Sequence, residues 1–366
     1  MIDRCIGEVE RFADHWGRAP LHLSTSDDFR DVFDIDALDT LIASTSRRPE
    51  VRLVRDGSPV DPASYTTGLR LGGRHVEDAV DPNKVAQQFS DGATIVVQSL
   101  HRTCPAVSRM AAELEEELGH PVQVNAYCTP AGAAGLAPHR DGHDVLVRQL
   151  HGTKSWHVEG LGSIELAPGD AMYIPAGTEH HASAQQSTSL HLTIGILRIT
   201  YRAVVQRVLA ATDGLDAPLP VGWNRDDADL QDHLTTAFEL AGKALADVDA
   251  PDVAARERRR RRPRREPSGR LASVLRLPDL DGTTVVRIAR GAAPTLELLD
   301  DGAVRVHLDD RRVQLPGGAR SALEQLMGGD DVRVDDLVEL DASSRVVVAR
   351  RLVAEGMLEI RPAAHT

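Results

Sequence analysis

The sequence predicts a mixed α+β chain in which a jelly-roll barrel is followed by a helical segment and a small winged-helix domain. Short apolar runs separated by Gly, Pro and Asp fill residues 121–200, as is typical of a β-sandwich or barrel. Residues 201–250 carry apolar side chains at helical spacing around a Pro-rich break. The last hundred residues begin with strands and then run helix, short strand, helix, helix and closing strand, the order of a winged helix.

Length, charge and cysteine content limit the class of protein. A chain of 366 residues, 42% of them hydrophobic, is expected to form two or three domains. The formal net charge of -13 argues against a general polyanion binder. Three cysteines without a C-x-x-C pair indicate neither a disulfide framework nor a zinc knuckle. Because no apolar run has the length of a membrane span or a signal-peptide core, we expect a cytoplasmic protein with no membrane contact.

The region before residue 121 has a mixed pattern. Apolar spacing predicts two helices and two short strands there, at residues 6–16, 108–119, 51–57 and 94–100. We therefore expect a first domain at residues 1–200, with its barrel core at about 85–200, and a helical segment at 201–255.

A block of arginine, RERRRRRPRREPSGR, occupies residues 256–270. It cannot bury itself, so we expect an exposed interdomain linker or a solvated helix end. An RNA or ribosome contact through residues 256–265 is the alternative. The predicted winged-helix domain, residues 271–366, has a candidate recognition helix at 344–356 with three arginines. Its acidic neighbours favour a packing role over DNA reading.

A cluster of histidine and aspartate opens the stretch HRDGHDVLVRQLHGTKSW, residues 139–156. Non-haem Fe(II) enzymes use two histidines and one carboxylate on one face of the metal. Residues i and i+2 of a strand point the same way, so His139 and Asp141 can face inward together. His143 shares that parity but lies further along, and Asp144 points the opposite way. An H-x-D pair alone is a weak signal.

A third ligand and a cation lie downstream. PGDAMYIPAGTEHHASAQ, residues 168–185, supplies His180 or His181 after a strand and a turn. The open positions of such a metal suit a 2-oxo acid, whose far carboxylate needs a fixed cation. Lys154 follows a strand and a turn and can reach inward as that cation, although an ordinary solvated lysine is the simpler alternative.

Two further strands predict a polar pocket wall. In VQVNAYC, residues 122–128, the polar residues Asn125 and Tyr127 share one face, opposite an apolar one. In SLHLTIGI, His191 and Thr193 share a face in the same way. His191 is either part of the pocket wall or a hydrogen-bonded core residue.

Taken together, these motifs resemble those of the JmjC-type 2-oxoglutarate oxygenases of the ribosomal-oxygenase group. FADHWGRAPLHL near the start is similar to the opening pattern of that group. The order of barrel, helical dimerisation segment and carboxy-terminal winged helix also matches, so the resemblance covers nearly the whole chain. It implies a cupin-like double-stranded β-helix for the barrel.

The resemblance also implies roles for individual residues. APHRDGHDVLVRQLHGTKSW and GDAMYIPAGTEHHA match the group's two main motifs, which places the iron ligands at His139, Asp141 and His180. Lys154 falls on the cation that pairs with the far carboxylate of 2-oxoglutarate. The N-x-Y match implies that Asn125 and Tyr127 line the pocket of co-substrate and substrate. Leu146 and Arg148 depart from the group's usual aromatic or apolar residues, so the outer face of that strand is expected to pack differently.

The function implied is hydroxylation that depends on Fe(II), 2-oxoglutarate and O2. The implied substrate is an arginine or histidine side chain of a basic ribosomal protein, which an acidic chain suits. A homodimer is implied through the helical segment. The alternatives are a hydroxylase of a peptide natural-product precursor, an N-methyl demethylase, and a non-catalytic cupin-like regulator. The intact ligand set argues against the regulator.

Overall fold

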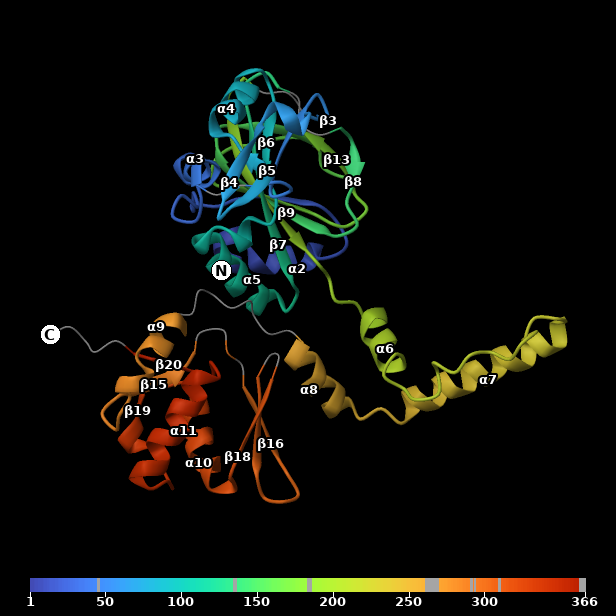
Figure 1. The fold of residues 1–366 in the computed structure, drawn as a ribbon. Helices are drawn as coiled ribbons and strands as arrows, with labels where there is room; N and C mark the ends of the chain where they lie inside the picture. The colour runs from blue at the N-terminus through green and yellow to red at the C-terminus, as the bar shows by residue number, and fades with distance from the viewer. Residues whose placement is uncertain are drawn as a thin grey trace. The chain divides into compact units, whose positions relative to one another are not determined.

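The computed structural model describes residues 1–44, 47–133, 137–182, 186–260, 270–289, 292, 294–308 and 311–361. The chain divides into two compact units, residues 1–197 with 263–366 and residues 198–262 (Figure 1). Most of the Arg-rich block, residues 261–269, lies outside the described residues. Residues 256–260 of that block form the end of a helix.

Residues 1–197 fold into two antiparallel sheets. The larger sheet has the strand order β1-β12-β9-β14-β7-β6-β2-β3, and the smaller has the order β11-β10-β13-β8. A separate hairpin joins β4 and β5. The strands are β1 (Leu21–Ser24), β2 (Val51–Arg55), β3 (Ser58–Pro59), β4 (Thr66–Leu71), β5 (Arg74–Val80), β6 (Thr94–Val97), β7 (Val122–Thr129), β8 (His139–Arg140), β9 (Asp144–His151), β10 (Lys154–Val158), β11 (Gly162–Leu166), β12 (Asp170–Ile174), β13 (Glu179–Ala182) and β14 (Ser189–Ile196).

The two sheets pack face to face. Side chains of β9 and β12 meet those of β10, β11 and β13 in one buried cluster that includes Val147, Val158 and Met172. The outer face of the larger sheet carries a second and bigger core under the amino-terminal helices. The expected barrel region, about 85–200, supplies most of the strands, while β1, β2 and β3 come from before it.

Five helices belong to this part of the described chain: α1 (Ile2–Ile6), α2 (Val9–His15), α3 (Ile35–Ser44), α4 (Pro82–Ser90) and α5 (Pro105–Leu118). In α5, Val107, Met110, Ala111 and Leu114 recur at helical spacing and are all buried. The prediction of one helix over residues 6–16 is wrong, because Gly7 adopts φ +79 and ends α1 before α2 begins.

Arg148 in β9, which replaces an aromatic or apolar residue of the group, is held by contacts with the amino-terminal segment. Its side chain is fully buried and its guanidinium carbon lies 4.6 Å from the centroid of the Phe29 ring. It donates hydrogen bonds to the Thr25 hydroxyl and to the carbonyls of Asp27 and Gly169. The outer face of β9 therefore fastens the amino-terminal segment to the sheet.

Residues 198–262 are helical: α6 (Tyr201–Leu209), α7 (Asp227–Ala246) and α8 (Ala250–Arg260). A bidentate ion pair between Arg207 and Glu257, with N···O distances of 2.7 and 3.0 Å, links α6 to α8. No described side chain of α6 or α7 is buried. Phe238 on α7 is 71% exposed, and Leu234 and Leu245 on the same helix are also exposed.

Residues 270–361 form an α+β fold with a core of their own. Its described elements are α9 (Arg270–Leu275), β15 (Val285–Ile288), β16 (Thr295–Leu298), β17 (Val304–His307), β18 (Arg312–Leu315), α10 (Arg320–Met327), β19 (Val332–Arg333), α11 (Ala342–Ala354) and β20 (Leu358–Ile360). They build two small sheets, ordered β19-β15-β20 and β16-β17-β18. The helix expected between β19 and α11 is only a 3-10 turn, Val334–Asp336, because the backbone is already extended at Leu337.

The arginines of α11 are engaged within this domain. Arg345 donates to the carbonyl of Asp335, Arg350 to the carbonyl of Leu280, and Arg351 pairs with Glu355. These contacts support the packing role expected for this helix. A winged-helix assignment of the domain stays a prediction.

Candidate functional site

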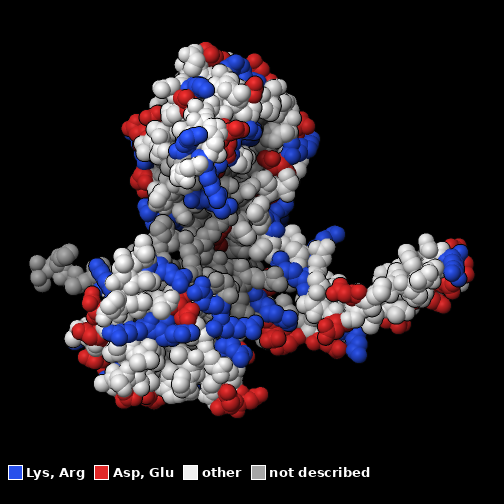
Figure 2. Space-filling model, in the orientation of Figure 1, with Lys and Arg blue, Asp and Glu red and all other residues white. Residues whose placement is uncertain are grey.

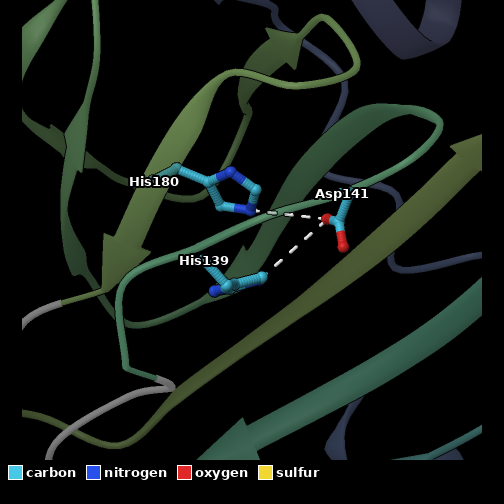
Figure 3. Close-up of side chains that lie close together, drawn as sticks. All are labelled: His139, Asp141 and His180. Carbon is cyan, nitrogen blue, oxygen red and sulfur yellow. Dashed lines mark ion pairs between the residues drawn. The ribbon is translucent and has the colours of Figure 1, made fainter.

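His139, Asp141 and His180 meet at the end of the smaller sheet. His139 on β8 and His180 on β13 are directly paired across the two antiparallel strands, and Asp141 follows β8 immediately. Figure 3 shows the three side chains turned toward one another. The Nε2 atoms of His180 and His139 lie 3.5 and 4.0 Å from the same Asp141 carboxylate oxygen. One potential ligand atom from each residue lies within 4.8 Å of the others.

Backbone carbonyls fix the orientation of both imidazoles. The Nδ1 atom of His139 lies 2.8 Å from the carbonyl oxygen of Ala137, and that of His180 lies 3.1 Å from the carbonyl oxygen of Thr178. A carbonyl only accepts, so each Nδ1 carries the proton. In the neutral form of each ring the Nε2 atom then carries the lone pair on the side of Asp141, as in metal-bound histidines.

This donor set fits Fe(II). Two neutral imidazoles and one carboxylate on one side of an ion form the facial triad of non-haem iron enzymes. Burial lowers the pKa of His180, which favours its neutral, ligating form. His181, the other candidate of the motif, points elsewhere: its ring lies 5.4 Å from that of His157, the residue paired with it on β10.

Lys154 lies inside the same pocket. Its side chain is 3% exposed, and its ammonium donates to the Thr129 hydroxyl at 2.9 Å. No carboxylate of the described residues lies within ion-pair distance of it. Burial lowers the pKa of Lys154 to about 8. A buried cation held by one neutral partner is suited to binding the carboxylate of a small molecule.

The pocket between these groups has a volume of about 260 Å³. Among its lining residues are the three candidate ligands, Lys154, and the predicted wall residues Asn125, Tyr127 and His191. The His191 ring stacks on Tyr127 with centroids 5.1 Å apart and contacts Trp156 edge-on. Its pKa is lowered well below the ordinary value by burial and by the nearby Lys154 charge, so His191 is a neutral wall residue.

Other predicted residues have partners that explain their positions. The Asn125 amide oxygen accepts from the backbone N–H of Ser99, so this side chain supports a neighbouring turn as well as the pocket wall. Asp144 accepts from the Tyr173 hydroxyl and from the backbone N–H of Ala176, which makes it structural. His143 lines the pocket beside Gly195, where a Cβ atom would lie 2.6 Å from the imidazole.

Among the pocket residues that were not predicted from the sequence are Arg52, Thr129 and Trp156. Thr129 continues the alternation of Asn125 and Tyr127 along β7, which was the available signal. Trp156 stands two residues after Lys154 in the same motif and shares its face of β10. Arg52 lies in a strand predicted as apolar, and the residues around it do not indicate which strand lies beside it.

The fold and the site define a class of protein: a double-sheet barrel that carries a two-histidine, one-carboxylate site and an anion-binding lysine. Comparison with protein families assigns the segments 99–164 and 161–204 to the JmjC domain. Residues 99–204 of the chain thus match the JmjC domain, and the chain is similar to ribosomal oxygenases, as the motifs indicated. Fe(II) and 2-oxoglutarate are the metal and co-substrate of this class, and the residues present fit both.

Curated proteins are similar in sequence to about half of this chain. The chain is 29% identical over 202 residues to a bifunctional lysine-specific demethylase and histidyl-hydroxylase NO66 of Branchiostoma floridae, covering 54% of this chain and 32% of that protein. It is 29% identical over 213 residues to ribosomal oxygenase 1 of Gallus gallus, covering 50% and 34%. The chain therefore spans about a third of the length of these relatives.

Solved structures share the fold over nearly the whole chain. YcfD, a ribosomal oxygenase from Escherichia coli solved with cobalt and succinic acid, gives a TM-score of 0.53 at 16% identity over 97% of this chain and 98% of that chain. The same protein with cobalt and 2-oxoglutarate gives 0.51 at 17%. At this identity the likeness establishes the fold. Among the described residues, no helix has the length and apolarity needed to cross a bilayer.

Proposed function

We propose that this chain is an Fe(II)- and 2-oxoglutarate-dependent protein hydroxylase that acts on an arginine or histidine side chain of a ribosomal protein. The observation that carries the proposal is the placement of His139, Asp141 and His180 in one pocket with the buried Lys154. A scaffold without catalysis needs neither the ligand set nor the cation. The intact set therefore argues against a non-catalytic regulator.

Each pocket residue has a definable task. His139, Asp141 and His180 would hold the iron from one side and leave the pocket side open. Lys154, oriented by Thr129, would bind the far carboxylate of 2-oxoglutarate and so align the co-substrate. Iron and 2-oxoglutarate supply the oxidising power that the protein's own side chains lack. Buried apolar residues such as Val145 and Trp156 line the pocket and exclude bulk water.

Tyr127 and Asn125 would contact the substrate side chain. Burial raises the pKa of the Tyr127 hydroxyl, so it stays neutral and can both donate and accept a hydrogen bond. Names of the relatives support a ribosomal substrate and a histidine target. The net charge of -13 suits a basic ribosomal protein as partner.

N-methyl demethylation is the second candidate, because one group of relatives carries the name of a lysine-specific demethylase as well as a histidyl-hydroxylase. The same pocket serves both reactions, since both oxidise one C–H bond of the substrate. Their products differ: hydroxylation adds one oxygen atom to the protein, and demethylation removes a methyl group. Hydroxylation of a natural-product precursor peptide stays a prediction without a supporting contact.

Dimerisation through residues 201–255 is part of this proposal. Exposed apolar side chains on α7, among them Phe238 and Leu234, support it, and α7 shows mainly uncharged side chains at the right of Figure 2. The cytoplasmic location and the RNA contact of residues 256–265 stay predictions.

The function is tested by intact-mass comparison of ribosomal proteins from wild-type cells and from cells that lack the gene. Loss of one oxygen atom from one ribosomal protein, restored by the wild-type gene and not by His139→Ala, is expected. Unchanged masses of all ribosomal proteins would contradict the proposal that the substrate is a ribosomal protein. A ribosomal protein that is heavier by a methyl group in the deletion cells would favour the second candidate.

A further inference from the structure

We propose that Arg52 is a specificity-determining residue that admits an uncharged side chain, such as a neutral imidazole, and opposes the guanidinium group of arginine. This inference rests on the proposed function and chooses between its two candidate targets. Arg52 lies outside the metal ligands and outside the motifs that define the family match, which covers residues 99–204.

The strand geometry aims Arg52 into the pocket. Arg52 belongs to β2, which pairs with β6 so that Arg52 lies opposite Val96. Val51 and Leu53 on either side of it are buried in the core under the helices. Arg52 and Val54 alternate to the other face and line the pocket.

The guanidinium of Arg52 lacks an acidic partner. Its side chain lies within hydrogen-bonding reach of the Tyr127 hydroxyl, and its Nε atom is buried with no hydrogen-bond partner in the described structure. No ion pair joins it to a described carboxylate, whereas Arg47 pairs with Asp78 and Arg140 with Glu159. The Arg52 charge is thus held at the pocket wall without neutralisation.

With iron and 2-oxoglutarate bound, the pocket would keep a net positive charge, and that charge is the one on Arg52. The two positive charges of Fe(II) would be balanced by Asp141 and by the near carboxylate of 2-oxoglutarate, and Lys154 would pair with its far carboxylate. Arg52 then leaves one unbalanced positive charge next to Tyr127, a residue proposed to touch the substrate. A second guanidinium entering this partly buried space meets like-charge repulsion, while a neutral imidazole does not.

The test uses two small probes of matched shape, N-acetylarginine methylamide and its uncharged citrulline analogue. Binding is measured by tryptophan fluorescence, because Trp156 lines the pocket, with Trp156→Phe identifying the pocket signal. Titrations are run on the full chain with Mn(II) and 2-oxoglutarate. This readout does not depend on turnover.

Wild-type protein is expected to bind the citrulline probe about 10- to 100-fold more tightly than the arginine probe. Arg52→Glu is expected to reverse that preference, and Arg52→Lys to keep it. Arg55→Glu is the matched control, because Arg55 lies on the same strand but bonds Gln88 instead of lining the pocket. Circular dichroism establishes that each variant is folded, and Arg52→Gln replaces Arg52→Glu if the latter fails to fold.

A probe preference that is the same in wild-type protein and in the folded Arg52 variants would overturn the inference. So would oxidation of an arginine in the ribosomal proteins by the wild-type enzyme. If ribosomal proteins are not oxidised while the probe preference follows the charge at position 52, the ribosomal function fails and the role of Arg52 stands.

Discussion

Replacing Lys154 by methionine is expected to increase the stability of the fold and to weaken the binding of 2-oxoglutarate. The buried ammonium has a pKa of about 8, against 10.5 for an unburied lysine, so its charged form is disfavoured in the folded state. A difference of 2.5 pKa units corresponds to about 3 kcal/mol. Methionine fills a similar volume without this cost, and we expect Lys154→Met to raise the free energy of unfolding at pH 7 by up to about 3 kcal/mol.

The sign follows from proton linkage. A lysine with a lowered pKa binds fewer protons in the folded state than in the unfolded state. The destabilisation is therefore absent above the unfolded pKa, grows as the pH falls from 10.5 to about 8, and is complete below about 8. The unfolding free energy of wild-type protein should rise with pH across this window, and that of Lys154→Met should rise less.

Binding of 2-oxoglutarate should change in the opposite direction. A buried, charge-assisted hydrogen bond contributes about 2–3 kcal/mol, so Lys154→Met should weaken 2-oxoglutarate binding by about 30- to 150-fold. In wild-type protein the affinity should fall above pH 8, where Lys154 loses its proton. Calorimetric titration in the presence of Mn(II) measures both effects, with the exposed Lys84→Met as control. Unchanged 2-oxoglutarate affinity in Lys154→Met would refute the role of this residue.

Three further changes test other parts of the structure. His180→Ala should lower bound Fe(II), measured by elemental analysis after desalting, to less than about a tenth of the wild-type content, because two protein ligands remain; retention of full metal content would exclude His180 as a ligand. Arg148→Ala should lower the free energy of unfolding by about 3 kcal/mol in urea titrations, because the side chain is fully buried and the carbonyls of Asp27 and Gly169 each lose one of their donors. A loss below about 1 kcal/mol would contradict this. Phe238→Asp should convert a dimer to a monomer in light scattering, while Thr236→Asp on the opposite face of the same helix should not. A monomeric wild-type protein would remove the proposed interface.

Much of the metal site could be predicted from local pattern. Strand parity alone indicated that His139 and Asp141 face the same way, and the two residues do converge on one point. The choice of His180 over His181 came from the resemblance, since both follow the same turn. In the structure the register of β13 against β8 separates them.

The pocket wall opposite the metal could not be predicted in this way. Arg52 and Tyr127 are 75 positions apart in sequence order and meet because β2 pairs with β6, and β6 pairs with β7. Periodicity indicates which face of a strand is buried, but it carries no information on which strand lies alongside. The end of α1 at Gly7 was not predicted, because apolar residues at helical spacing continue on both sides of it.

The central claim is that this pocket transfers one atom of O2 to a ribosomal protein with 2-oxoglutarate as co-substrate. The most direct measurement incubates the purified chain with Fe(II), 2-oxoglutarate and a ribosomal-protein extract under isotopically heavy O2, followed by mass spectrometry. One heavy oxygen atom in one ribosomal protein and one in succinate, both absent with His139→Ala, are expected. Heavy oxygen in neither product would contradict the account.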